Sequence, residues 1–111
     1  MINLNKMWIN MTSNKKCKRR IQELEYEDIN IKEYIIIDVR SKREFKEKHL
    51  NGAINIALPD IRKNIDKFVT NKEKRILVCC EYGVRSKQAV EILENLGYSQ
   101  VYNLKGGLEN I

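Results

Sequence analysis

The chain has 111 residues, of which 42% are hydrophobic and 32% charged, and this composition is typical of one small globular domain. No run approaches the roughly 18 consecutive apolar residues of a membrane span, and the first 20 residues lack the apolar stretch of a secretory signal. The cysteines at positions 17, 79 and 80 have no C-x-x-C spacing, so they predict neither a disulfide framework nor a zinc site. We therefore expect a cytoplasmic protein that binds no membrane, metal or cofactor.

The net charge of +6 is concentrated at one end of the chain. Residues 1–20 hold six basic side chains and no acidic one, whereas residues 21–111 hold 15 of each. We expect residues 1–17 to be a flexible extension and residues 18–111 to be the folded domain. The basic run at 15–20 suits an anionic partner, but solvated basic tails are common, and we do not expect a nucleic-acid role.

The first half of the domain alternates between strand-like and helix-like patterns. Residues 21–24 predict a short edge strand, and residues 25–31 a turn or short helix. The β-branched run at 34–39 is typical of a strand covered on both faces in a parallel sheet. Ser41-Lys-Arg-Glu44 has the spacing of a capping box and predicts a helix over about 42–48. A second buried strand is expected at 53–56, ended by Pro59.

The second half repeats this alternation. Ile61, Ile65, Phe68 and Val69 recur at helical spacing and predict a helix over about 60–69. A strand is expected at 75–79, a helix at 86–96, a last strand at 101–104 and, after a Gly-Gly hinge, a short terminal helix. Strands and helices that alternate in this way indicate an α/β domain with a mainly parallel sheet.

Cys80 follows the strand at 75–79 and precedes the helix at 86–96, so it lies in a strand-loop-helix turn. In parallel sheets this carboxyl edge is where ligands bind. The free N–H groups and the dipole at a helix start favour negative charge, whether on a thiolate or on a bound oxyanion. Cys80 is therefore a candidate nucleophile.

Four motifs occur in order along residues 21–111: Asp38-Val-Arg40 with Glu44-Phe45, His49-Leu-Asn-Gly-Ala-Ile-Asn-Ile56, Cys80-x-x-Gly83-x-Arg85-Ser86, and Leu104-Lys-Gly-Gly107. This set resembles that of a single-domain rhodanese. The resemblance implies a rhodanese-like three-layer α/β fold, with a mainly parallel central sheet flanked by helices. It also implies sulfurtransferase chemistry through a persulfide on Cys80.

The residues after Cys80 suit sulfur transfer, which needs an ionised cysteine and donors that stabilise negative charge. The N–H groups of residues 81–86 are expected to form an anion nest, with Gly83 supplying torsions that a side chain would forbid. Arg85 is expected to add a positive charge for an oxyanion, and Ser86 either to cap the helix or to donate to the sulfur. The predicted catalytic residues are Cys80 and Arg85, and the predicted substrate-binding residues are Glu81, Tyr82, Gly83, Val84 and Ser86.

Loop length separates this hypothesis from a phosphatase. The protein tyrosine phosphatases place five residues between cysteine and arginine, whereas this loop has four, which favours sulfur over phosphate. Glu81 is acidic where rhodaneses that use thiosulfate well often carry a basic residue. We expect its carboxylate to repel thiosulfate, so that thiosulfate:cyanide activity is weak and a protein persulfide or another small donor is preferred.

The remaining candidates have structural interpretations. Strand alternation directs Cys79 away from the face of Cys80, so a buried apolar thiol is expected there, and Cys17 is expected to be a dispensable exposed thiol. His49 belongs to a turn motif, and persulfide transfer needs no dedicated base. Asp38 and Arg40 are expected to tie the loop to the helix, for instance through an Arg40–Glu44 pair.

Two functional hypotheses follow. In the first, the protein is a sulfurtransferase that moves a sulfane sulfur through Cys80 from thiosulfate, polysulfide or a protein persulfide to a thiol or cyanide. In the second, it is a non-catalytic or sulfur-carrying module that acts with a partner protein. Steady turnover with small donors favours the first.

Overall fold

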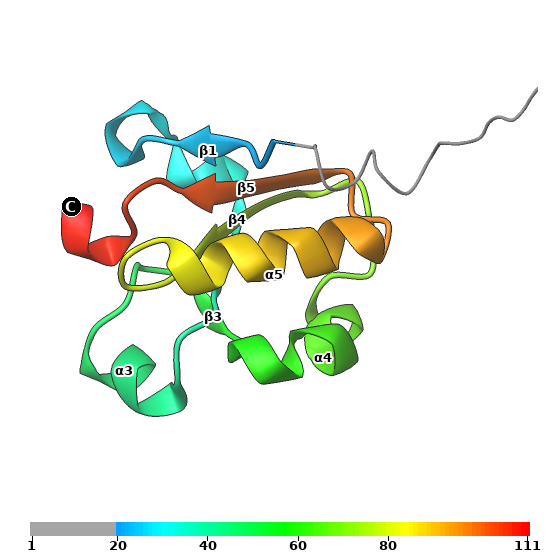
Figure 1. Ribbon diagram of the computed structural model, residues 1–111, viewed down its shortest axis with the longest axis horizontal. Coiled ribbons are helices and arrows are strands. Elements are labelled where there is room, and N and C mark those ends of the chain that lie inside the picture. Colours follow the sequence, from blue (N-terminus) through cyan, green and yellow to red (C-terminus); the bar gives the residue numbers. More distant parts are fainter. Residues whose placement is uncertain (1–19) are drawn as a thin grey trace, which may run out of the picture.

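The computed structural model describes residues 20–111 (Figure 1). Within them, five strands form one sheet in the order β1-β5-β4-β2-β3, and every neighbouring pair is parallel. This confirms the predicted α/β class with a parallel sheet. The strands are β1 Glu23–Leu24, β2 Ile35–Asp38, β3 Ile54–Asn55, β4 Arg75–Cys79 and β5 Gln100–Leu104.

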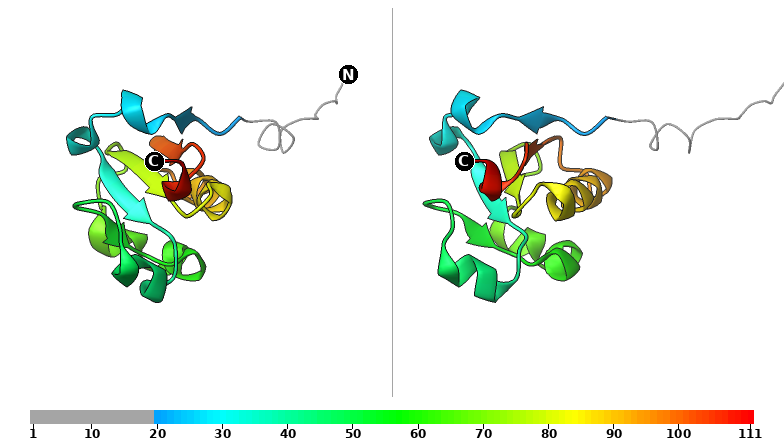
Figure 2. Two further views of the ribbon diagram at one scale, coloured as in Figure 1. Left: turned by 90° about the vertical axis from the view of Figure 1, so that its left-hand side faces the viewer. Right: turned by 60° about the vertical axis from the view of Figure 1, so that its left-hand side comes forward.

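Helices and connecting segments cover both faces of the sheet, as Figure 2 shows from the side. On one face, α4 and α5 bury Ile65, Val90 and Leu93 against the strands. On the other, η1, η2 and η4 close a smaller apolar cluster around Leu77. The helical elements are η1 Tyr26–Asp28, η2 Ile31–Glu33, α3 Lys42–Glu47, η3 Leu58–Asp60, α4 Ile61–Phe68, α5 Val84–Asn95 and η4 Leu108–Asn110.

The predicted elements are all present, with differences at their ends. The α5 helix begins at Val84, two residues before the predicted start, because Gly83 takes a left-handed conformation and serves as its N-cap. Phe68 is the last residue of α4, as its helical spacing predicted, and its side chain is half exposed. The terminal helix is a single 3₁₀ turn. The predicted extension at 1–17, with Cys17, lies outside the described residues.

The sheet brings three distant segments together at one edge. Asp38 at the end of β2 is in register with Cys79 at the end of β4, and Val78 is in register with Asn103 of β5. The segments that follow these strands therefore emerge side by side, and the loop after β4 lies between the other two (Figure 1). No helix in the described part of the chain is long and apolar enough to cross a membrane.

Candidate active site

The loop after β4 encloses the sulfur of Cys80. The Sγ atom accepts hydrogen bonds from the backbone N–H groups of Gly83, at 3.1 Å, and Ser86, at 3.3 Å. Cys80 is only 1% exposed, so the sulfur lies at the bottom of the loop. Two of the amides in the predicted nest thus point at the sulfur, and both stabilise negative charge there.

The loop is held in shape by the segment after β5. The N–H of Leu108 donates to the carbonyl of Cys80, and that of Glu109 to the carbonyl of Glu81, each at 2.9 Å. Gly107 lies so close to the loop that a Cβ on it would stand 2.4 Å from the Glu81 carbonyl oxygen. The Gly-Gly pair after β5 is therefore part of the wall of the site.

Arg85 is bound by Glu44 of α3. Its guanidinium makes two hydrogen bonds to the carboxylate, at 2.9 and 3.1 Å. The hydrogen bond from Arg85 is the main reason why the pKa of Glu44 is lowered from 4.5 to about 2, and the bond to Glu44 raises the pKa of Arg85. The predicted Arg40–Glu44 pair was wrong, because Glu44 both closes the capping box with Ser41 and binds the arginine of the loop.

Arg40 is buried and joins the end of β2 to the loop. It donates to the carboxylate of Asp38, closest at 2.8 Å, to the carbonyl of Lys48 at 2.7 Å, and to the carboxylate of Glu81 at 3.2 Å. The hydrogen bond to Asp38 raises the pKa of Arg40. Glu81, expected to repel anions, is therefore paired with a cation, and its repulsion is weaker than its sequence position predicts.

Ser86 lies inside the first turn of α5 and does not cap it, so the predicted capping role was wrong. Its hydroxyl instead lies 3.3 Å from the Cys80 Sγ and donates to Oδ1 of Asn103. Sequence reasoning missed Asn103, which is fully buried on β5. The available signal was an amide side chain at the next-to-last position of a predicted buried strand, since a buried polar group needs partners.

The other predicted residues lie around the loop. Cys79 is fully buried in the apolar cluster opposite that of Cys80, as predicted, and burial raises the pKa of its thiol far above the usual value. The side chains of Tyr82 and Val84 are exposed, at 66% and 65%. His49 is exposed, and its ring stacks on Phe45 with centroids 3.7 Å apart.

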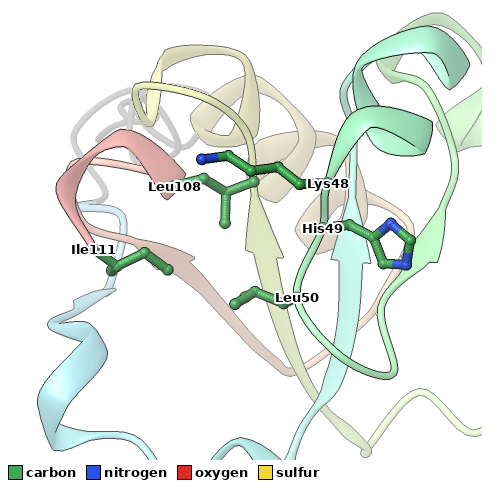
Figure 3. Close-up of a pocket in the computed structure, with 5 residues that line it drawn as sticks. All are labelled: Lys48, His49, Leu50, Leu108 and Ile111. Carbon is green, nitrogen blue, oxygen red and sulfur yellow. The ribbon is translucent and has the colours of Figure 1, made fainter.

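One pocket is lined by the loop itself, and another by the segments that follow α3 and β5. The first, of about 340 Å³, is lined by Tyr82, Gly83 and Val84 together with β1 and the segment after β5. The other, of about 130 Å³, is lined by Lys48, His49, Leu50, Leu108 and Ile111 (Figure 3). The imidazole of His49 points away from this second pocket, which agrees with a structural interpretation of the histidine. In the described residues, no three His, Cys, Asp or Glu side chains gather as a metal site.

The Arg85–Glu44 pair makes a testable contribution to stability. We expect Glu44→Gln to lower the free energy of unfolding at pH 7 by about 0.5–1 kcal/mol, because both side chains are partly exposed and glutamine still accepts from Ser41. The pKa of Glu44 is depressed by folding, so its stabilisation is complete above pH 4.5 and is lost as the pH falls toward 2. The free energies of unfolding of the wild type and Glu44→Gln should therefore become equal as the pH falls toward 2. Urea unfolding of both proteins between pH 7 and pH 2 measures this difference.

Glu47→Gln is the control for that prediction. It makes the same change at the exposed carboxyl end of α3, where an acidic residue gains nothing from the helix dipole. We expect unchanged or slightly higher stability. A Glu44→Gln deficit that stayed constant down to pH 2 would contradict an ionic contribution from Glu44.

Together, the fold and the loop define a class: a parallel α/β protein with a cysteine sulfur held by backbone amides at the carboxyl edge of the sheet. Comparisons with known proteins identify that class. A model described as "Rhodanese-like domain" matches residues 13–111. The chain therefore belongs to the rhodanese-like domain family.

Individual relatives agree with this assignment. The chain is 41% identical over 75 residues to thiosulfate sulfurtransferase PspE of Escherichia coli (strain K12), covering 68% of this chain and 71% of PspE. It is 30% identical over 92 residues to thiosulfate sulfurtransferase GlpE of Coxiella burnetii (strain RSA 493), covering 82% and 84%. A solved structure titled "rhodanese with anions from E. coli" matches with a TM-score of 0.66 and 40% identity, covering 70% of this chain and 91% of that one.

Proposed function

We propose that Cys80 is the sulfur-carrying residue of this rhodanese-type sulfurtransferase. The observation that supports the proposal is the pair of backbone N–H groups, from Gly83 and Ser86, that point at its Sγ atom. Cys79, the adjacent thiol, lies in an apolar cluster on the other face of the sheet, and its sulfur accepts no such hydrogen bond from the residues that the structure describes. The relatives named thiosulfate sulfurtransferases perform chemistry for which this arrangement is suited.

The reaction has two displacement steps at sulfur. The Cys80 thiolate attacks the sulfane sulfur of a donor, a new S–S bond forms at Sγ, and the old bond breaks with its electron pair leaving on sulfite or a thiolate. An acceptor thiolate, or cyanide, then attacks the outer sulfur, and the Cys80 thiolate is regenerated. No net redox co-reactant is needed, and the loop amides stabilise the charge present before and after each step.

The charges around the loop bear on the choice of donor. Three carboxylates, Asp38, Glu44 and Glu81, are paired with only two cations, Arg40 and Arg85. A dianion such as thiosulfate must compete with Glu44 for Arg85, so we infer weak binding of thiosulfate and preference for a polysulfide or protein persulfide. We place the reaction in a reducing compartment such as the cytoplasm, which suits the free thiols Cys79 and Cys80.

Localising the transferred sulfur tests the proposal. The protein is incubated separately with thiosulfate, with polysulfide and with a cysteine desulfurase plus cysteine, trapped with an alkylating agent, and analysed by peptide mass spectrometry. We expect one added sulfur on Cys80, and faster loading by polysulfide or the desulfurase than by thiosulfate. Sulfur found on Cys79 or Cys17 instead would contradict the assignment.

A second candidate is a sulfur-carrier module that acts only with a partner protein. The exposed side chains of Tyr82 and Val84 on the rim of the loop favour it, because exposed apolar groups beside a reactive sulfur suit a protein contact. Steady turnover with small donors and cyanide selects the enzyme. Absence of turnover, combined with sulfur transfer only from a partner protein, selects the carrier.

A further inference from the structure

The buried amide of Asn103 has a defined orientation. Its Nδ2 group donates to the carboxylate of Glu23 at 2.9 Å and to the carbonyl of Gly83 at 3.3 Å. Both partners are acceptors only, so the NH₂ end of the amide must face them. The Oδ1 atom is thereby turned toward the hydroxyl of Ser86.

This orientation decides where the proton of Ser86 points. A serine hydroxyl has one proton and two lone pairs, and Oδ1 of Asn103 can only accept. The hydroxyl therefore donates to Asn103 and presents a lone pair to the Cys80 Sγ, 3.3 Å away. The thiol form of Cys80 donates to that lone pair, whereas the ionised form has no proton to donate.

We propose that Asn103 is a positioning residue that holds the Ser86 proton away from Cys80, leaving the ionised sulfur with its two backbone amides as donors. The proposal rests on Cys80 as the reactive sulfur. It has a chemical consequence, since the nucleophilicity of a thiolate falls as the thiolate is stabilised. Because Asn103 keeps the Ser86 hydroxyl from donating a hydrogen bond to the ionised sulfur, the sulfur stays reactive toward the sulfane-sulfur donor.

Substitutions at Asn103 and Ser86 add and remove no charge around the sulfur, but Asn103→Leu also removes a hydrogen bond to Glu23. Only the part of a change in the ionisation behaviour of Cys80 that depends on Ser86 can therefore be assigned to the hydroxyl and its partner. From every element packed against the loop, the charged groups around the sulfur are Glu23 of β1, Asp38 and Arg40 after β2, Glu44 of α3, and Glu81, Arg85 and Lys87 of the loop and α5.

The test is the pH dependence of Cys80 alkylation by iodoacetamide, followed by peptide mass spectrometry in the full chain. In Asn103→Leu, the leucine side chain has a shape similar to that of asparagine but no oxygen that accepts from Ser86. The Ser86 hydroxyl is thus free to donate to the ionised sulfur. We expect the midpoint of the alkylation profile to move down by about one pH unit. In a Ser86→Ala background, the same substitution should give no further shift, because the hydroxyl through which it acts is gone.

Ser86→Ala alone keeps the proposal testable if Asn103→Leu does not fold. If Asn103 holds the proton, removing the hydroxyl takes no donor from the ionised sulfur, and the midpoint stays unchanged or moves down. A midpoint about one unit higher would show that Ser86 donates to the sulfur, and would overturn the proposal. An equal Asn103→Leu shift with and without Ser86 would also overturn it, because the effect would then pass through the Gly83 backbone or the Glu23 carboxylate. Alkylation needs no sulfur donor, so a failure of this proposal can be distinguished from a failure of the proposed role of Cys80 in sulfur transfer.

Discussion

Replacing Cys80 by serine is expected to abolish persulfide formation and to lower sulfur-transfer turnover by at least about a thousandfold. An alcohol at this position is scarcely ionised at neutral pH, so the first displacement at the sulfane sulfur does not occur. The serine oxygen still accepts from the N–H groups of Gly83 and Ser86, and the variant should therefore fold. Steady-state turnover with polysulfide and cyanide measures the loss, and unfolding in urea verifies the fold.

Cys79→Ala is the matched control, because it removes the neighbouring thiol and leaves the loop intact. Alanine is used here in place of serine because the cluster around Cys79 is apolar, and a serine hydroxyl buried there without a partner would be unfavourable. We expect a loss of stability of about 1 kcal/mol from the smaller side chain and unchanged turnover. If Cys79→Ala lost as much activity as Cys80→Ser, the sulfur would have to move between the two thiols.

The order of the elements and the place of Cys80 could be predicted because both depend on local patterns. The β-branched run of β2 and the Ser41–Glu44 capping box determine their elements through short-range physics, and both occur as expected. The split of Cys79 and Cys80 between two faces follows from strand alternation alone. Parallel order then carries Cys80 to the ligand-binding edge.

The partners of the charged groups could not be predicted in this way. Glu44 binds Arg85 across 41 residues of sequence, and Arg40 binds Glu81 across the same separation. Such pairs depend on how α3 and the loop meet in space, which local periodicity does not encode. Asn103 was missed for the same reason, because its three partners come from β1, the loop and α5.

Gly107→Ala is expected to lower the free energy of unfolding by about 3 kcal/mol or more and to reduce sulfur transfer at least about tenfold. Gly107 has φ 71° and ψ −170°, a conformation that essentially only glycine adopts. Its new Cβ would also stand 2.4 Å from the Glu81 carbonyl oxygen and 2.6 Å from the Tyr82 nitrogen, both of which belong to the backbone of the loop. Relief of that contact must move the loop, and with it the donors that point at the Cys80 Sγ.

Gly52→Ala separates the effect of contact from that of backbone conformation. Gly52 also has a positive φ, of 84°, but a Cβ on it meets nothing within 4 Å. We expect this control to lose about 1 kcal/mol of stability and no activity, since the strain is local and the new Cβ touches no part of the loop. Urea unfolding and sulfur loading of Cys80 measure both variants. If Gly107→Ala matched Gly52→Ala in both, the segment after β5 would not shape the site, and the sulfur cradle would depend on the loop and α5 alone.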